Sequence, residues 1–192
     1  MRYVFFDTET TGKPINYNAP ASEVDNWPRL VQIGWIVFDE NKEKKLELEF
    51  IIKPDGFTIP QEASRIHGVT QEIAEQDGFD IKTILELFFE GIGNDDKFIG
   101  HNVSFDLSVV GAENFRYFGF DPFSGRDSIC TMKSSTDYCK LPGTRGKYKW
   151  PKLSELYQTL FHENMGAAHT ALQDIQNTAK CYFELERLGV IK

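Results

Sequence analysis

The sequence lacks any apolar stretch that approaches the roughly 20 residues needed to span a bilayer. Its N-terminus also lacks the basic segment, apolar core and cleavage site of a secretory signal, because it runs directly into Asp7. We therefore expect a protein that does not enter membranes and that works in the cytoplasm.

Cysteine is scarce in this chain. The three cysteines, Cys130, Cys139 and Cys181, are widely spaced and form no C-x-x-C pair. This pattern indicates neither a zinc site nor a disulfide framework, so we expect free thiols. The sequence also contains no internal repeat, low-complexity tract or domain linker. At 192 residues, 41% of them hydrophobic, it has enough apolar material for one domain over residues 1–192.

Positive charge is in deficit, since 21 Lys and Arg stand against 29 Asp and Glu, for a net charge of −8. This balance does not by itself indicate nucleic-acid binding, because phosphate binders usually carry an excess of cations. Residues 140–152 differ, because Tyr148 and Trp150 alternate there with cations and no acid is present. Such a segment suits a groove for a single strand. The alternative, a solvated basic loop before a helix, is favoured by the segment alone. The cations are Lys140, Arg145, Lys147, Lys149 and Lys152.

The hydrophobic pattern predicts a single domain of strands and helices in mixed order. Strands are expected at residues 2–7, 30–39, 45–53 and 98–100, with a short one near 128–131. Helices are expected at residues 70–76, 81–92, 103–118, 151–161 and 170–188. Three strands in series, followed by helices around a fourth, are typical of an α/β or α+β domain. The sixteen Phe predict an aromatic-rich core.

Two carboxylates stand two residues apart, Asp7 and Glu9, at the end of the first expected strand. Residues with this spacing point to the same face of a strand. At about 5 Å and an effective dielectric constant near 20, their repulsion is roughly 3 kcal/mol. A raised pKa or a bound divalent cation relieves such repulsion. Glu47 and Glu49 form another alternating acidic pair, which we interpret as a solvated strand face.

Two later segments carry further acids. Asp106 lies about one turn into the helix expected to begin near Asn102, and alone it would be a first-turn acid that complements the helix dipole. His169 and Asp174 are five residues apart, so on one continuous helix they would differ by about 140° and point in different directions. They converge only if His169 precedes the helix and Asp174 lies in its first turns, which Thr170 as N-cap permits.

Taken together and in this order, three segments resemble the motifs of the DEDD exonucleases in their histidine-bearing branch. The segments are FDTETTG (residues 6–12), HNVSFD (residues 101–106) and HTALQD (residues 169–174). The proofreading epsilon subunit of bacterial DNA polymerase III typifies this branch, and ribonuclease T and oligoribonuclease belong to the wider group. The resemblance implies a ribonuclease H-like α/β fold, a mixed and roughly five-stranded sheet flanked by helices.

The resemblance also implies an activity and assigns residues to it. It implies 3′→5′ hydrolysis of phosphodiester bonds with two divalent metal ions, Mg²⁺ or Mn²⁺. Asp7, Glu9, Asp106 and Asp174 correspond to the four metal-binding acids, and His169 corresponds to the general base. Carboxylates are the hard oxygen ligands that these ions prefer, and a neutral histidine can accept a proton from water near neutral pH.

Further residues correspond to the family's substrate neighbours. By this resemblance His67 lies beside the terminal nucleotide, and Thr8 and Thr10 offer hydrogen bonds to its sugar. Asn102 and Phe105 correspond to neighbours of a phosphate and a base, although Phe105 could also belong to the core. The loops at residues 13–29 and 121–146 could frame the substrate cleft.

Three functions remain open at this point. We favour an exonuclease of single-stranded DNA 3′ ends, of the proofreading or repair type. The second is an exoribonuclease, which recognition of a 2′-hydroxyl would distinguish. The third is a catalytically silent module that binds nucleic acid or a polymerase, and the presence of all four acids and His169 argues against it. A DNA polymerase is a conceivable partner, but we expect a nuclease that works alone because the chain ends three residues after Gly189.

Overall fold

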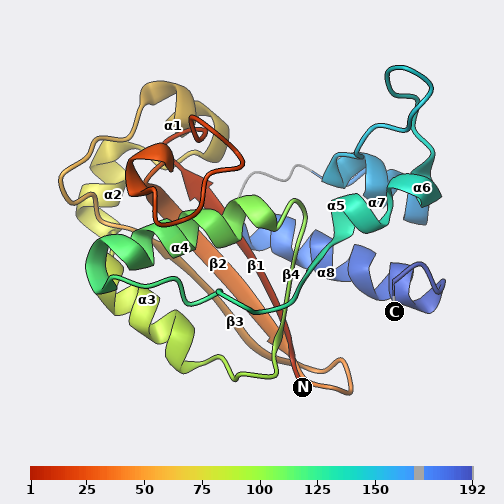
Figure 1. Cartoon of the computed structure of the whole chain (residues 1–192), viewed down its shortest axis with the longest axis horizontal. Helices are drawn as coiled ribbons and strands as arrows, with labels where there is room; N and C mark the ends of the chain where they lie inside the picture. Colours follow the sequence, from red (N-terminus) through yellow and green to blue (C-terminus); the bar gives the residue numbers. More distant parts are fainter. Residues whose placement is uncertain (167–170, 192) are drawn as a thin grey trace.

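The fold comes from a computed structural model that describes residues 1–166 and 171–191. The described strands form one mixed five-stranded sheet in the order β3-β2-β1-β4-β5 (Figure 1). β1, β2 and β3 are antiparallel neighbours, whereas β4 runs parallel to β1 and β5 runs parallel to β4. This confirms the expected α/β class and the mixed sheet. The strands are β1 (Tyr3–Thr10), β2 (Leu30–Phe38), β3 (Lys44–Ile51), β4 (Lys97–Gly100) and β5 (Ser128–Cys130).

Helices cover both faces of the sheet. α3 and α4 pack on one face, and α7 and α8 pack on the other (Figure 1). The helices are α1 (Gln61–His67), α2 (Gln71–Asp77), α3 (Ile81–Glu90), α4 (Ser104–Phe118), α5 (Thr131–Ser134), α6 (Thr136–Cys139), α7 (Leu153–Phe161) and α8 (Ala171–Arg187), with a 3-10 turn η1 (Val24–Asn26). None of the helices in the described residues is long and apolar enough to cross a bilayer.

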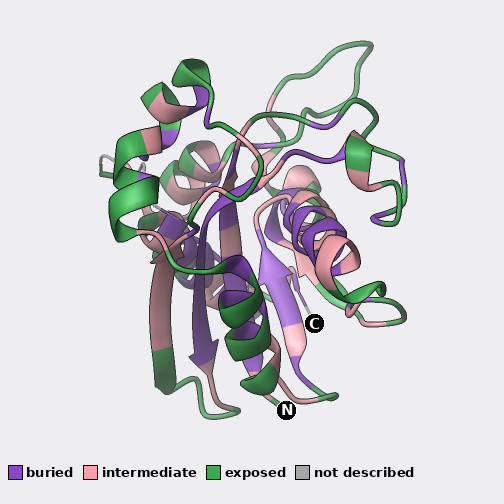
Figure 2. Cartoon of the chain, turned by 90° about the vertical axis from the view of Figure 1, so that its left-hand side faces the viewer, coloured by how far each residue is buried: buried purple, intermediate pink, exposed green. Residues whose placement is uncertain are grey.

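The alternation of side chains along β1 divides the core into two layers. Val4 and Phe6 belong to the cluster under α3 and α4, whereas Tyr3 and Phe5 belong to the cluster under α8. Figure 2 shows the central strands largely in the buried colour, whereas the edge strand β3 has the intermediate and exposed colours. Because the same alternation continues past Phe6, the next residues of β1 are divided between the two faces.

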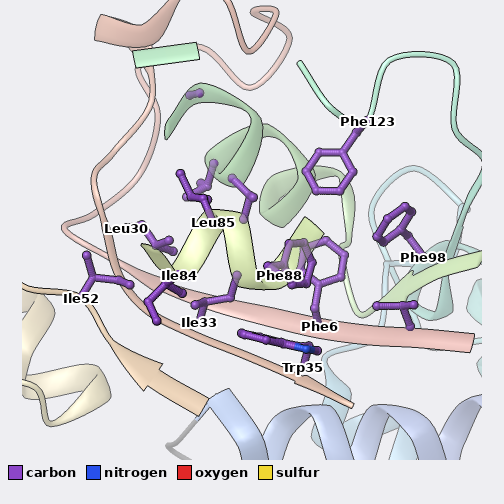
Figure 3. Packing of buried hydrophobic residues seen from close by; sticks show 14 of the residues in the cluster. Phe6, Leu30, Ile33, Trp35, Ile52, Ile84, Leu85, Phe88, Phe98 and Phe123 are labelled. Carbon is purple, nitrogen blue, oxygen red and sulfur yellow. The ribbon is translucent and has the colours of Figure 1, made fainter. Parts of the chain in front are cut away.

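Aromatic side chains dominate the larger cluster, as the sixteen Phe predict. Phe88 of α3 stands edge-on to Trp35 of β2, with ring centroids 5.1 Å apart. Phe123 meets Phe98 at 90° and 5.0 Å, and it stacks on Phe6 (Figure 3). Aromatic pairs in these geometries add about 0.5–1.5 kcal/mol each beyond their buried area. These aromatic rings form a closely packed cluster against the middle of β1.

Most of the expected elements are present within a few residues of their predicted ends. Thr70 caps α2 as expected, because its hydroxyl oxygen accepts a hydrogen bond from the Ile73 N–H at 3.2 Å. β1 is longer than expected, since it pairs with β2 as far as Thr10. Backbone pairing outweighs the polar side chains there. The three cysteines are free thiols, as predicted.

Three short helices were not anticipated, namely α1, α5 and α6. α1 buries only Ala63 and His67, so it shows little of the apolar spacing that reveals a helix in a sequence. α5 and α6 have four residues each, which is too short for any periodicity. They lie in the segment of residues 121–146 that was expected to be irregular.

Candidate active site

The candidate site lies where β1 ends. Asp7 and Glu9 continue the series of Tyr3 and Phe5, so both carboxylates point toward the face covered by α8. Thr8 points toward the opposite face, where α4 lies. Both acids are partly buried and stand on one regular strand, which confirms the spacing argument made from the sequence.

Close approach of α8 to the sheet brings Asp174 to the same place. Gly34 of β2 is the pairing partner of Asp7. A Cβ atom on Gly34 would lie 2.8 Å from the Ile175 Cδ1 atom and 3.6 Å from the Ala171 Cβ atom. The start of α8 therefore packs directly against β2 at Gly34. Asp174 lies in the first turn of α8, beside Asp7.

Asp106 comes from the other face and is fixed by Thr8. The backbone N–H and the hydroxyl of Thr8 both donate to the Asp106 Oδ1 atom, at 3.0 and 2.7 Å. Asp106 is buried in the first turn of α4, as the sequence predicts. Thr8 thus holds this carboxylate against the strand that carries the other acids.

The four carboxylates affect one another's protonation. Burial raises the pKa of Asp7 well above its usual value, and the charges of Asp106, Glu9 and Asp174 raise it further. Burial, together with Asp174, Asp106 and Glu49, raises the pKa of Glu9 to about 7. Burial also raises the pKa of Asp106 to about 7, although the hydrogen bonds from Thr8 oppose the shift. Four acids from three separate elements therefore share one small region.

Glu49 is a member of this region that the sequence did not reveal. Its Oε1 atom accepts a hydrogen bond from the Leu172 N–H at 2.8 Å, in the first turn of α8. Its negative charge also raises the pKa of Glu9. The interpretation of Glu47 and Glu49 as a solvated strand face is therefore wrong. Glu47 is likewise engaged, by Lys44 and Gln176.

The donor set suits a hard divalent cation. In residues 1–166 and 171–191, no three acid, histidine or cysteine side chains are already gathered tightly enough to enclose one ion. Burial raises the pKa values of Asp7, Glu9 and Asp106, and the charges of neighbouring acids add to the shifts at Asp7 and Glu9. Carboxylate oxygens under such repulsion are what Mg²⁺ and Mn²⁺ bind well. The residues present fit this class of ion.

A cavity of about 530 Å³ adjoins the acids on the side of α1. Glu9, Thr10 and His67 line it, together with Lys13 and Ile66. His67 is buried, and its Nδ1 atom accepts a hydrogen bond from the Val69 N–H at 3.1 Å. Burial lowers the pKa of His67, while the Thr10 carbonyl opposes the shift. The imidazole of His67 thus lines the wall of this cavity next to Glu9.

A second cavity, of about 380 Å³, adjoins the start of α4. Asn102 and Phe105 line it, as do Tyr17 and Trp27 from the loop that precedes β2. Asn102 has a φ angle of +72°, in the left-handed region that Asn tolerates better than most residues. The ring of Phe105 lies 6.5 Å from that of Tyr17 and 6.4 Å from that of Trp27. Phe105 therefore lines a cavity as well as packing against the core.

The remaining predicted residues divide as follows. His169 lies outside the described residues, so its assignment as a general base stays a prediction. The Thr8 hydroxyl donates to Asp106, and the Thr10 hydroxyl donates to the Gly12 carbonyl at 2.7 Å. Both hydroxyl protons are therefore used within the protein, and Thr8 positions a carboxylate.

Comparison with known families decides the identity of the domain. A model of the RNase_T family, described as exonuclease, matches residues 4–182. The chain belongs to the exonuclease family. An uncharacterized exonuclease, CP81, of Escherichia phage 186 is 30% identical to this exonuclease domain over 188 residues, covering 91% of this chain and 83% of the phage protein. A PolC-type DNA polymerase III of Ureaplasma parvum is 27% identical over 134 residues, or 69% of this chain and 8% of the polymerase.

Solved structures of E. coli exonuclease I have the same fold as this exonuclease domain. The complex of that enzyme with a dA16 oligonucleotide superimposes with a TM-score of 0.75 at 19% identity. The zinc-bound form in a complex with single-stranded DNA gives a TM-score of 0.74 at 22% identity. The match to the dA16 complex covers 97% of this chain, which spans only 41% of the exonuclease I chain. At these identities the likeness shows the fold alone.

Proposed function

We propose that this domain is a metal-dependent exonuclease that removes nucleotides from single-stranded DNA in the 3′→5′ direction. The observation that most supports the proposal is the meeting of Asp7, Glu9, Asp106 and Asp174 from β1, α4 and α8, with the pKa values of the first three raised. Such a cluster of buried acids destabilises the folded chain, and groups with perturbed pKa values gather at functional sites. The order of the three motifs supports membership of the histidine-bearing branch.

In this proposal the four acids hold two divalent cations, Mg²⁺ or Mn²⁺. The cations would stabilise the attacking and leaving oxygens of an in-line displacement at phosphorus. Thr8 keeps the Asp106 carboxylate in position through two hydrogen bonds to one oxygen. Glu49 holds the first turn of α8 and so fixes the position of Asp174. His169 takes a proton from the attacking water.

The two cavities would receive the end of the strand. The cavity beside Glu9 and His67 suits the 3′-terminal nucleotide, because it opens directly next to the acids. The cavity lined by Asn102 and Phe105 suits the nucleotide before it, since an aromatic wall can stack a base. The phosphodiester bond between the two nucleotides would then lie over the acid cluster.

DNA is preferred as the substrate on the strength of the relatives. The similar proteins include a DNA polymerase and exonuclease I in complex with the DNA oligonucleotide dA16. The match to the polymerase is limited to 8% of its length, so a polymerase partner for this chain stays a prediction. Whether residues near the acids form a hydrogen bond to a 2′-hydroxyl determines the preference for DNA or RNA.

The test is cleavage of a 5′-labelled 15-mer, as DNA and as RNA, with Mg²⁺, with Mn²⁺ and with chelator. We expect a ladder that shortens from the 3′ end only with metal, with DNA cleaved faster than RNA. Asp106→Asn, which keeps the shape of the side chain, should abolish the ladder, whereas the exposed Asp95→Asn should not. Faster cleavage of RNA than of DNA would show that RNA, and not DNA, is the preferred substrate. If the folded, metal-loaded protein cleaved neither, the proposal would be refuted.

A further inference from the structure

A basic β-hairpin stands between α6 and α7. The N–H of Lys149 donates to the Leu141 carbonyl at 3.1 Å, and the N–H of Lys147 donates to the Thr144 carbonyl at 3.2 Å. Arg145 and Gly146 form its tip, with φ angles of +56° and +74°. Two positive φ angles in a two-residue turn are the geometry that closes a tight hairpin. Figure 1 shows this hairpin projecting from the upper right of the molecule.

The two arms of the hairpin are in very close contact. A Cβ atom on Gly143 would lie 2.5 Å from the Lys147 carbonyl oxygen and 2.7 Å from the Lys149 nitrogen. Pro142 and Tyr148 form a bridge beside this contact. Glycine at position 143 is therefore required for the hairpin to close, and the segment is a built element rather than a slack loop.

The hairpin carries positive charge that the described acids do not neutralise. Lys149 pairs with Glu155 at 2.5 Å. Within the described part of the chain, Arg145 and Lys147 form no ion pair and are exposed. These cations are free in a protein whose net charge is −8. A local positive tip on an acidic protein attracts an anionic partner to one place.

The base of the hairpin reaches the second cavity of the candidate site. Trp150 is 62% exposed, and it lines the cavity together with Asn102 and Phe105. Lys133 of α5 lines the same cavity. An exposed tryptophan beside lysines, in line with a cavity at the acids, provides a face for a base and charges for phosphates.

His101 holds the base of the hairpin against the sheet. Its Nε2 atom lies 3.0 Å from the Pro151 carbonyl oxygen, which can only accept, so Nε2 carries the proton. Its Nδ1 atom lies 3.0 Å from the Thr131 hydroxyl. Pro151 directly follows Trp150 in the chain. The segment that leads from β4 into α4, and so to Asp106, is thereby tied to the hairpin.

From this arrangement we propose that the hairpin at residues 141–150 binds the single-stranded tail that precedes the cleaved nucleotides. Trp150 stacks a base of the tail, and Arg145, Lys147 and Lys133 contact its phosphates. The inference rests on the proposed function, because it places the tail next to the nucleotides in the cavities. A single strand suits this surface better than a duplex, since only unpaired bases expose a face for Trp150 to stack on.

The test separates binding of the tail from cleavage. Arg145→Glu/Lys147→Glu would be made in the Asp106→Asn background, and the binding of labelled dT15 and dT3 would be measured by fluorescence anisotropy. We expect about tenfold weaker binding of dT15 and unchanged binding of dT3. The dependence of log K on log salt should become less steep by about 1.4, because each of the two lost phosphate contacts on a single strand contributes about 0.7 to the slope. Unchanged binding of dT15, or equal weakening with dT3, would overturn the inference.

Two further variants control for charge and for folding. Lys44→Glu/Lys45→Glu makes the same change in net charge at the start of β3, at the opposite end of the sheet from Glu9, and should leave binding of dT15 unchanged. Gly143→Val keeps every charge but prevents the two arms of the hairpin from packing together. It should therefore weaken the binding of dT15 as much as the double variant does. Equal weakening by the β3 variant, or no effect of Gly143→Val, would count against the hairpin.

Trp150 offers a direct optical readout. Trp27 and Trp35 are 4% and 1% exposed, whereas Trp150 is 62% exposed, so Trp150 accounts for the solvent-accessible part of the fluorescence. Adding dT15 should quench that fluorescence, and Trp150→Phe should remove the quenching. Equal quenching by blunt duplex or by polyglutamate would show a general anion site and overturn the inference. If binding of dT15 depends on the hairpin but the native domain cleaves nothing, only the proposed function fails.

Discussion

The Asp106 Oδ1 atom accepts both the backbone N–H and the hydroxyl of Thr8, at 3.0 and 2.7 Å. This pair ties the carboxylate from α4 to the strand that carries the other two acids, because Thr8 stands on β1 between Asp7 and Glu9. The side chain between the two strand acids is therefore the one that positions the helix acid.

Replacing Thr8 by Val should impair metal use without unfolding the domain. Val keeps the shape of the side chain and the backbone bond but removes a hydroxyl bond to a carboxylate, worth about 1.5–3 kcal/mol. We expect the pKa of Asp106 to rise further, the Mg²⁺ concentration for half-maximal rate to rise several-fold, and kcat to fall about tenfold. Thr8→Ser, which retains the hydroxyl, should behave nearly as the native domain. Equal rates for Thr8→Val and the native domain at limiting Mg²⁺ would contradict this role.

The metal-free domain should be destabilised by its own acids at alkaline pH. An Asp106 carboxyl with a pKa of about 7 in the folded state and about 4 in the unfolded chain takes up a proton on folding at pH values between the two. Stability from this group is therefore present at low pH and is lost as pH rises toward 7. Asp106→Asn removes the charge but retains an oxygen that can accept both bonds from Thr8.

In chelator at pH 8, Asp106→Asn should therefore melt above the native domain, by roughly 5 °C for about 2 kcal/mol. The difference should shrink as pH falls and vanish below about pH 4, where Asp106 is protonated in both the folded and the unfolded native chain. Comparing the two proteins cancels the opposing effect of His101, whose pKa burial lowers to about 4. Saturating Mg²⁺ should reverse the order, since it stabilises only the native acid cluster. A constant difference from pH 5.5 to 8 would exclude a raised pKa at Asp106.

A buried ion pair fixes the loop that frames the second cavity. Glu113 of α4 is fully buried, and its Oε1 atom accepts hydrogen bonds from Arg29 and from the Leu30 N–H, both at 2.9 Å. The same oxygen forms an ion pair with Arg116 at 3.0 Å. Glu113→Ala would leave two partly buried cations without their carboxylate partner, which costs about 3 kcal/mol. We expect the melting temperature to fall by roughly 10 °C.

The control for this change lies on the surface. Glu184 pairs with Arg187 at 2.6 Å in the last helix, and Glu184→Ala should lower the melting temperature by about 2 °C at most. Cleavage by Glu113→Ala at 15 °C should persist, because no part of the acid cluster is removed. A loss of cleavage at that temperature, with the fold intact by circular dichroism, would assign Glu113 a role beyond bracing the loop.

The local features of the site were predictable from the sequence, because they depend on neighbours along the chain. The two-residue spacing of Asp7 and Glu9 sets their common face, and Thr70 has the side chain that caps α2. The position of Asp106 one turn into α4 follows from the short strand before it.

What the sequence could not reveal depends on contacts between distant segments. Gly34 looks like an ordinary strand glycine until Ile175 is seen to rest against it. Glu49 looks like a solvated acid until the first turn of α8 donates to it. His101 belongs to one of the three motifs, yet its hydrogen-bond partner Pro151 is 50 residues further along the chain. No spacing rule reports such partners, since each arises only when the elements pack.

The final prediction concerns His169, whose role follows from the motif. A general base must be neutral to accept a proton, and an unperturbed histidine has a pKa of about 6.5. With Mg²⁺ saturating, log kcat should therefore rise with unit slope below about pH 6.5 and level off above it. His169→Gln should lower kcat about a hundredfold and remove that slope, while dT3 affinity stays unchanged. The exposed His162→Gln is the matched control and should keep the native profile. A flat profile from pH 6 to 9 in the native domain would exclude a histidine base.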